Sequence, residues 1–125
     1  MKYLIDTNIL LWYINGDEQL PNEFEKIIDN SESEIFISIA SLWEITIKVS
    51  KGSLVIQDNL DMFFRKNIET AGINILPIEL KHLLMLKQLP FIHRDPFDRL
   101  IFSQAESENL KFLYTDIIFD NYLSR

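Results

Sequence analysis

Short apolar runs alternate with longer stretches of helical periodicity along the chain. Residues 2–6, 34–38, 73–76 and 111–115 form apolar runs bounded by polar or turn-forming residues, which predicts four buried strands. Apolar positions at helical spacing predict helices over 8–16, 20–29, 39–50, 60–71, 80–89 and 96–109, and a last helical turn or two at 117–123. Strands that alternate with helices are typical of parallel sheets. We therefore expect an α/β fold with a central parallel sheet of four or five short strands and helices on both faces, and residues 1–125 as a single domain.

Residues that favour helix ends support this division. Ser38 stands where it can cap the helix 39–50, and Asp58 is placed to cap the helix 60–71. Asp95 precedes Pro96, and proline suits the first position of a helix, so Asp95 is predicted to cap the helix 96–109.

Composition narrows the chemistry. The chain has no cysteine, which excludes disulfides, thiolate metal sites and a cysteine nucleophile and favours a cytoplasmic location. The chain has two histidines, which argues against a histidine-rich zinc site. No apolar run approaches the roughly 20 residues of a membrane span, so no membrane association is expected. The net charge of −7 argues against a protein that coats nucleic acid with a basic face, but its surplus carboxylates suit hard divalent cations.

Several acids fall where an open parallel sheet binds ligands, beyond the carboxyl ends of its strands. Asp6 ends the first predicted strand and Asp116 follows the fourth. Glu44 lies in the helix 39–50 on a polar stripe with Ser41 and Lys48. This stripe faces either water or a polar cleft, and the pattern leaves both open.

The segment "HRDPFDR", residues 93–99, contains two acids with different predicted tasks. Asp95, as the cap, accepts hydrogen bonds from backbone N–H groups, whereas Asp98 lies one turn into the helix and is freer to project into a crevice. The spacing alone also allows both acids to do no more than stabilise the helix start.

Four acids on separate segments suggest a carboxylate site for Mg²⁺ or Mn²⁺. Such a site suits phosphodiester hydrolysis, because a metal can activate water, orient phosphate and neutralise charge on the transition state.

Four stretches together resemble the PIN domain family, specifically the VapC-type toxin ribonucleases of type II toxin–antitoxin pairs. They are "YLIDTNILLW" (3–12), "ISIASLWEITIKVSKGSL" (37–54), "HRDPFDRLIFSQA" (93–105) and "DIIFDNY" (116–122). The resemblance implies a PIN-like fold and a Mg²⁺- or Mn²⁺-dependent endoribonuclease. Its catalytic and metal-binding acids fall on Asp6, Glu44, Asp98 and Asp116. It therefore assigns Asp98 to the site and Asp95 to the helix cap.

The fourth acid departs from the family pattern, in which a variable residue separates a threonine from the acid. Here Thr115 directly precedes Asp116, so Asp120 is a rival for this position. The resemblance also implies supporting, substrate-facing positions at Thr7, Asn8 and Ser38. Basic residues close in sequence to the acids are candidates for phosphate contact: Lys48, Lys51, Arg94 and Arg99.

The implied partners are an RNA substrate, a cognate VapB-type antitoxin and a second copy in a homodimer. Two alternatives remain, an RNA-processing PIN nuclease without an antitoxin and a non-catalytic PIN module that binds RNA or protein. A phosphatase of the haloacid-dehalogenase type is disfavoured, because it needs a second aspartate at position 8, where this chain has Asn8.

Overall fold

The computed structural model describes residues 1–123, and its order of elements follows the predicted alternation. The elements are β1 (Lys2–Ile5), α1 (Thr7–Asn15), α2 (Asn22–Asp29), β2 (Glu34–Ser38), α3 (Ile39–Ser50), α4 (Leu60–Phe64), the π-helical turn η1 (Arg65–Glu69), β3 (Asn74–Leu76), α5 (Leu80–Gln88), α6 (Pro96–Glu108), β4 (Lys111–Leu113), the 3₁₀ turn η2 (Ile117–Phe119) and α7 (Asp120–Leu123).

The strands of the described chain form one four-stranded sheet in the order β3-β2-β1-β4, and all its neighbours are parallel. In the register, Ile5 of β1 lies opposite Ile37 of β2 and Leu113 of β4. The predicted α/β fold with a parallel sheet is confirmed. The carboxyl ends of β1, β2 and β4 therefore meet at one edge.

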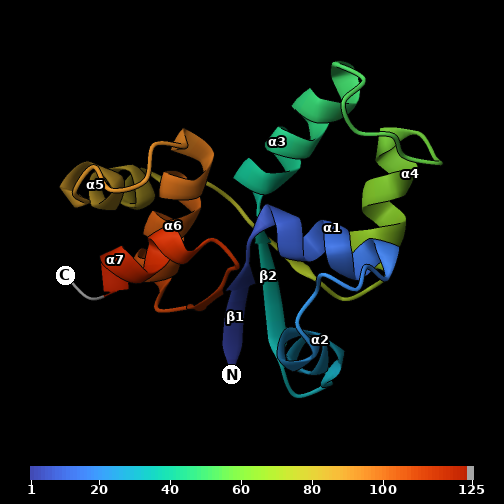
Figure 1. Ribbon diagram of the computed structural model, residues 1–125, viewed down its shortest axis with the longest axis horizontal. Coiled ribbons are helices and arrows are strands. Elements are labelled where there is room, and N and C mark those ends of the chain that lie inside the picture. The colour runs from blue at the N-terminus through green and yellow to red at the C-terminus, as the bar shows by residue number, and fades with distance from the viewer. Residues whose placement is uncertain (124–125) are drawn as a thin grey trace.

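Alternate residues of β1 build a core on each face of the sheet, as a strand buried on both sides requires. Tyr3 and Ile5 join a cluster with residues of α1, α3 and α4, whereas Leu4 packs with Ile101 and Ala105 of α6. Figure 1 shows α1, α2 and α4 on one side of the strands and α5, α6 and α7 on the other. The prediction of helices on both faces is confirmed.

Helix starts lie directly at the edge where the strands end. Asp6 caps α1 by accepting from the backbone N–H of Ile9, and Ser38 caps α3 by accepting from that of Ala40. Because a capping side chain satisfies backbone groups that the helix leaves unpaired, these short polar residues fix where each chain segment turns from strand to helix.

One predicted cap is wrong. Asn59, not Asp58, accepts a hydrogen bond at 2.9 Å from the backbone N–H of Met62 and caps α4. The predicted helix 60–71 also divides into α4 and the wider turn η1, which ends at Glu69. Neither asparagine nor aspartate is preferred strongly enough as a cap for the sequence to choose between neighbours.

No helix within residues 1–123 has the length and apolar character needed to cross a membrane.

Candidate functional site

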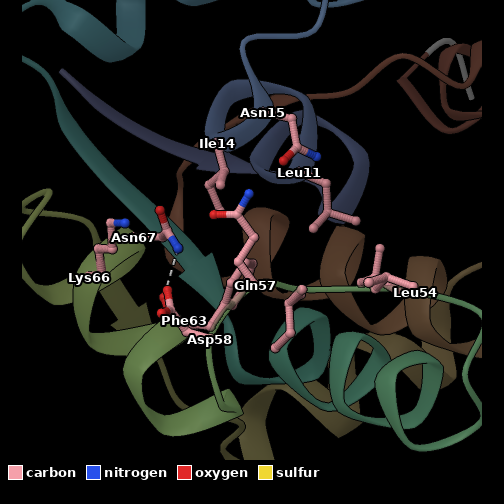
Figure 2. Close-up of a pocket in the computed structure, with 11 residues that line it drawn as sticks. Leu11, Ile14, Asn15, Leu54, Gln57, Asp58, Phe63, Lys66 and Asn67 are labelled. Atoms are coloured by element: carbon pink, nitrogen blue, oxygen red, sulfur yellow. Dashed lines mark hydrogen bonds between the residues drawn. The ribbon is translucent and has the colours of Figure 1, made fainter.

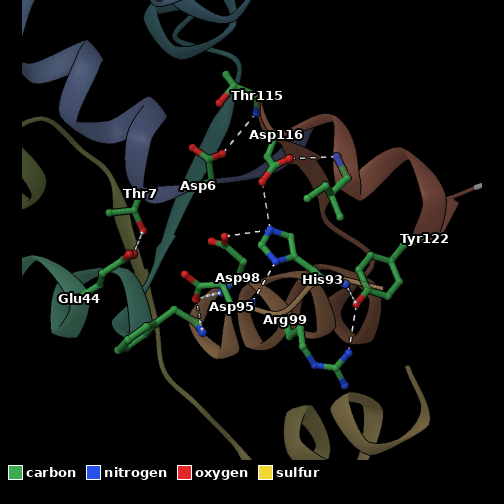
Figure 3. Close-up of polar contacts among 12 residues, drawn as sticks. Asp6, Thr7, Glu44, His93, Asp95, Asp98, Arg99, Thr115, Asp116 and Tyr122 are labelled. Atoms are coloured by element: carbon green, nitrogen blue, oxygen red, sulfur yellow. Dashed lines mark hydrogen bonds and ion pairs between the residues drawn. The ribbon is translucent and has the colours of Figure 1, made fainter. Parts of the chain in front are cut away.

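The four predicted acids line one small cleft, about 160 Å³ in volume, at the carboxyl edge of the sheet. Figure 3 shows the carboxylates of Asp6, Asp98 and Asp116 directed toward a common space, with Glu44 approaching from α3. The lining residues are Asp6, Thr7, Asn8, Glu44, Lys48, Asp95, Asp98, Asp116 and Phe119.

Asp6 is buried at the centre of this edge, with 6% of its surface exposed. Its Oδ1 accepts from the N–H of Ile9 at 2.8 Å, and its Oδ2 accepts from the N–H of Thr115 at 3.4 Å. The second bond links the end of β1 to the segment that follows β4. Asp6 thus helps to place the chain that carries Asp116.

Glu44 projects from α3, and the open question about its polar stripe is answered in favour of a cleft. Its Oε1 accepts from the hydroxyl of Thr7 at 2.8 Å, and its Oε2 lies 3.7 Å from Nζ of Lys48. Ser41 is fully buried beside Thr7, with 2.9 Å between the two hydroxyl oxygens. Ser41 and Glu44 therefore face α1 and the cleft, while Lys48 at the end of the stripe remains partly exposed at the cleft rim.

Asp95 caps α6 as predicted, and Asp98, one turn further into the helix, lines the cleft. Oδ1 of Asp95 accepts from the N–H groups of Phe97 and Asp98 at 2.8 and 3.2 Å, which makes Asp95 the cap of α6. Asp98 is turned into the cleft (Figure 3). The ring of Phe97 packs edge-on against Trp43, with centroids 4.9 Å apart. This contact holds the helix of Asp98 against the helix of Glu44.

The structure places Asp116, and not Asp120, in the cleft. Oδ1 of Asp116 accepts from the N–H of Ile118 at 3.0 Å and caps the 3₁₀ turn η2. Asp120 instead accepts a hydrogen bond from the hydroxyl of Tyr114. This chain lacks the variable residue that separates the threonine from the fourth acid in the family pattern. Asp116 nevertheless lies in the cleft with the other three acids.

His93 belongs to this site and was missed as a site residue by sequence reasoning. Its Nε2 lies 3.1 Å from Oδ2 of Asp98 and 3.1 Å from Oδ2 of Asp116 (Figure 3). The three side chains place one potential ligand atom each within 4.8 Å of one another. The available signal was its position in "HRDPFDR", two residues before the cap of the helix that carries Asp98.

The electrostatics of the cleft fit a divalent cation. The pKa of Asp98 is raised from 3.8 to about 7. Burial is the largest cause, the charges of Asp95, Glu44 and Asp6 contribute to the rise, and His93 opposes it. Burial likewise raises the pKa of Asp6 to about 6, against the hydrogen bonds from two backbone N–H groups.

Among the lining residues, all within the described part of the chain, Lys48 is the sole lysine or arginine facing these carboxylates. An all-oxygen donor set with excess negative charge is what Mg²⁺ and Mn²⁺ prefer. The residues present therefore fit such an ion.

The predicted supporting residues lie in different places. Thr7 and Asn8 line the cleft. Ser38 is fully buried below it, where its hydroxyl donates to the side chain of Gln104. Arg99 is not brought to the acids: its Nη1 donates to the carbonyl of Pro90 at 2.9 Å and to the hydroxyl of Tyr122 at 3.1 Å. A contact between Arg99 and substrate remains an untested prediction, and its buried guanidinium does not favour it.

Of the other predicted phosphate contacts, Lys48 lines the cleft, whereas Lys51 and Arg94 are exposed outside its lining.

A second hollow of about 460 Å³ lies between α1, the loop 54–58, α4 and η1 (Figure 2). Leu11, Ile14 and Phe63 supply apolar wall, and Asp58 and Lys66 supply charge. It lacks the convergent carboxylates of the first cleft, so the chemistry is assigned to the cleft at the sheet edge.

Two solved structures are similar to this chain over most of its length. One is VapBC2 from Rickettsia felis bound to a DNA fragment from their promoter, with a TM-score of 0.72 and 24% identity over 98% of this chain and 93% of that chain. The other is a toxin–antitoxin complex from Klebsiella pneumoniae, with a TM-score of 0.63 and 18% identity over 92% and 87% of the two chains. At these identities the likeness concerns the fold.

No curated protein sequence matches the chain. The family profile described as the PIN domain does match, over residues 3–122. With that match and with the parallel sheet and acidic cleft described above, the chain belongs to the PIN domain family.

Proposed function

We propose that the protein is a Mg²⁺- or Mn²⁺-dependent endoribonuclease that acts as the toxin of a VapBC-type toxin–antitoxin pair. The observation that carries the proposal is the convergence of Asp6, Glu44, Asp98 and Asp116 in one cleft. Members of the PIN domain family are in general nucleases. The similar solved structures are toxin–antitoxin complexes, which supports an antitoxin as partner.

In this proposal the four acids are the ligands of one or two metal ions. Asp6 and Asp98 bind most directly, and Glu44 and Asp116 complete the set of ligands and orient the attacking water. When bound, the metal supplies Lewis-acid activation of water and stabilises the charge that develops on the phosphate. Each carboxylate keeps lone pairs free beside its hydrogen bonds, since a carboxylate offers about four acceptor sites.

The remaining lining residues position these acids and the substrate. The hydroxyl of Thr7 holds Oε1 of Glu44, so the other oxygen stays turned toward Lys48. Lys48, with 41% of its side chain exposed, is the candidate for contact with a backbone phosphate. An acidic protein with so little basic surface is expected to select RNA by shape and single-stranded loops.

The test compares cleavage of total cellular RNA by wild type and Asp98→Asn, with Mg²⁺, with Mn²⁺ and with EDTA. Wild type should cut with either metal and not with EDTA, and a folded Asp98→Asn should lose cleavage. Asp58→Asn, the same chemical change at an exposed position outside the cleft, is the matched control and should cut like wild type. Equal cleavage by wild type and Asp98→Asn would exclude the metal site as drawn.

A second experiment separates a toxin from an RNA-processing nuclease and from a non-catalytic module. Expression of the wild-type chain should arrest bacterial growth, and Asp98→Asn should not. Co-expression of a small DNA-binding protein encoded beside it should relieve the arrest and co-purify with the chain. RNA cleavage without growth arrest or such a partner would favour the processing nuclease.

A further inference from the structure

His93 holds together two acids that come from distant parts of the chain. Asp98 lies in α6, and Asp116 follows β4, 18 positions later. Nε2 of His93 is equidistant from both, at 3.1 Å from Oδ2 of each. Two carboxylates this close repel each other, and a donor shared between them opposes that repulsion.

The other ring nitrogen fixes which nitrogen carries the proton. Nδ1 of His93 accepts a hydrogen bond at 3.1 Å from the backbone N–H of Asp95, so it presents a lone pair. In the neutral ring the proton is then on Nε2, which is hydrogen-bonded to Oδ2 of Asp116 and lies within ion-pair distance of Oδ2 of Asp98. The cap of α6 thus orients the imidazole through its own backbone.

The ring is also anchored against the C-terminal segment. His93 is 7% exposed, its ring packs on Phe119 with centroids 5.1 Å apart, and its backbone N–H donates to the hydroxyl of Tyr122 at 2.9 Å. The same hydroxyl accepts from Arg99, whose guanidinium also holds the carbonyl of Pro90. The segment before α6 and the segment after β4 are therefore joined at His93.

We infer that His93 is a positioning residue, whose Nε2 hydrogen-bonds to Asp116, attracts Asp98 at the same distance, and so holds both carboxylates within reach of one divalent cation. The inference rests on the proposed function in that these acids are metal ligands. Direct ligation by His93 would require loss of the proton from Nε2 and of the hydrogen bond from Asp95 to Nδ1. Partners that orient metal ligands in this way contribute roughly 10–100-fold to metal affinity.

The two amide side chains provide a matched pair of variants. In His93→Gln the side-chain NH₂ reaches the position of Nε2, whereas in His93→Asn it stops near the position of Nδ1, short of both carboxylates. His93→Phe keeps a ring against Phe119 and removes both nitrogens. Urea melts of the full chain in EDTA establish that each variant is folded.

The measurement is Mn²⁺ affinity by electron paramagnetic resonance. We expect His93→Asn and His93→Phe to bind at least about tenfold more weakly than wild type, and His93→Gln to recover to within about threefold. Equal affinity in all four proteins, or equal loss in the Gln and Asn variants, would overturn the positioning role.

Two spectroscopic readouts on the wild type need no variant. In the metal-free protein, ¹⁵N-edited NMR of the histidine rings should show the His93 proton on Nε2, and a proton-free Nε2 would overturn the inference. With ¹⁵N-histidine and Mn²⁺, electron spin echo modulation should show no nitrogen bound to the ion. A coordinated ¹⁵N would make His93 a ligand and overturn its assignment as a positioning residue.

Failure of this inference differs from failure of the proposed function. Wild type that binds Mn²⁺ more tightly than His93→Asn but cuts no RNA would reject the nuclease and keep the positioning role. If wild type cuts RNA and His93→Asn binds Mn²⁺ as tightly as wild type, the nuclease is kept and the positioning role of His93 is rejected.

Discussion

Neutralising Asp98 should stabilise the metal-free protein while it removes metal binding. Burial and the neighbouring acids raise the pKa of Asp98 from 3.8 to about 7, so its ionised form is disfavoured in the folded state. A shift of that size corresponds to roughly 4 kcal/mol at pH 8 if it were fully retained. Because 25% of the Asp98 side chain is exposed to water, we expect its ionisation to destabilise the folded state by about half that amount, ~2 kcal/mol.

The sign follows from proton uptake. Between pH 4 and pH 7 the folded protein holds a proton on Asp98 that the unfolded chain has released, so the wild type loses stability as pH rises through this window. Asparagine carries no charge at any of these pH values. Asp98→Asn should therefore be more stable than wild type at pH 8, by roughly 5–10 °C in Tm, and the difference should vanish near pH 4.

The assay is a set of thermal melts in EDTA at pH 8, 6 and 4, repeated at pH 8 with excess Mg²⁺. Metal should stabilise wild type and not Asp98→Asn, because an ion that binds the folded state alone adds stability that grows with the logarithm of its concentration relative to Kd. Asp58→Asn is again the control and should match wild type throughout. An Asp98→Asn protein that melts below wild type at pH 8 in EDTA would refute the reasoning.

Four further predictions concern single groups. Glu44→Gln keeps an oxygen to accept from Thr7 but loses charge, so RNA cleavage should fall at least about tenfold with no loss of Tm in EDTA. The fully buried side chain of Gln104 donates to the carbonyl of Pro77 and accepts from the hydroxyl of Ser38. Gln104→Leu removes both hydrogen bonds, and urea melts should show that the free energy of unfolding falls by roughly 2 kcal/mol. In the same assay, Asn59→Ala should lower the free energy of unfolding by about 1 kcal/mol, and Asp58→Ala should leave it unchanged. The opposite result would make Asp58 the cap of α4, as the sequence predicted. Mn²⁺ affinity should weaken up to about tenfold per pH unit below pH 7, because Asp98 must release its proton to bind, and a flat titration from pH 5 to 7 would contradict the raised pKa.

Features set by neighbouring residues could be predicted from the sequence. The strand and helix order follows from apolar runs and periodicity, and the cap at Asp95 follows from the adjacent Pro96. The spacing of Asp95 and Asp98 left open whether Asp98 also serves only the helix start, and it was the family resemblance that assigned Asp98 to the site.

Features that depend on contacts between distant residues could not be predicted from the sequence. His93 meets Asp116 across 23 positions, and no periodicity reports such a pair. Arg99 is adjacent to Asp98 in sequence, but one residue along a helix turns the side chain by roughly 100°, which directs it to Pro90 and Tyr122 instead of the cleft. Closeness in sequence to Asp98 therefore did not bring the side chain of Arg99 into the cleft.

The acids Asp6 and Asp116 are themselves caps of the elements that begin at the cleft. Asparagine caps a helix about as well as aspartate, and a single base change converts one codon into the other. A spontaneous mutation at either position would then yield a chain that keeps its fold and its surfaces but lacks a ligand for the metal. Under the proposed function, such a chain would be folded and catalytically inactive, and it would still present to an antitoxin the surfaces of the active protein.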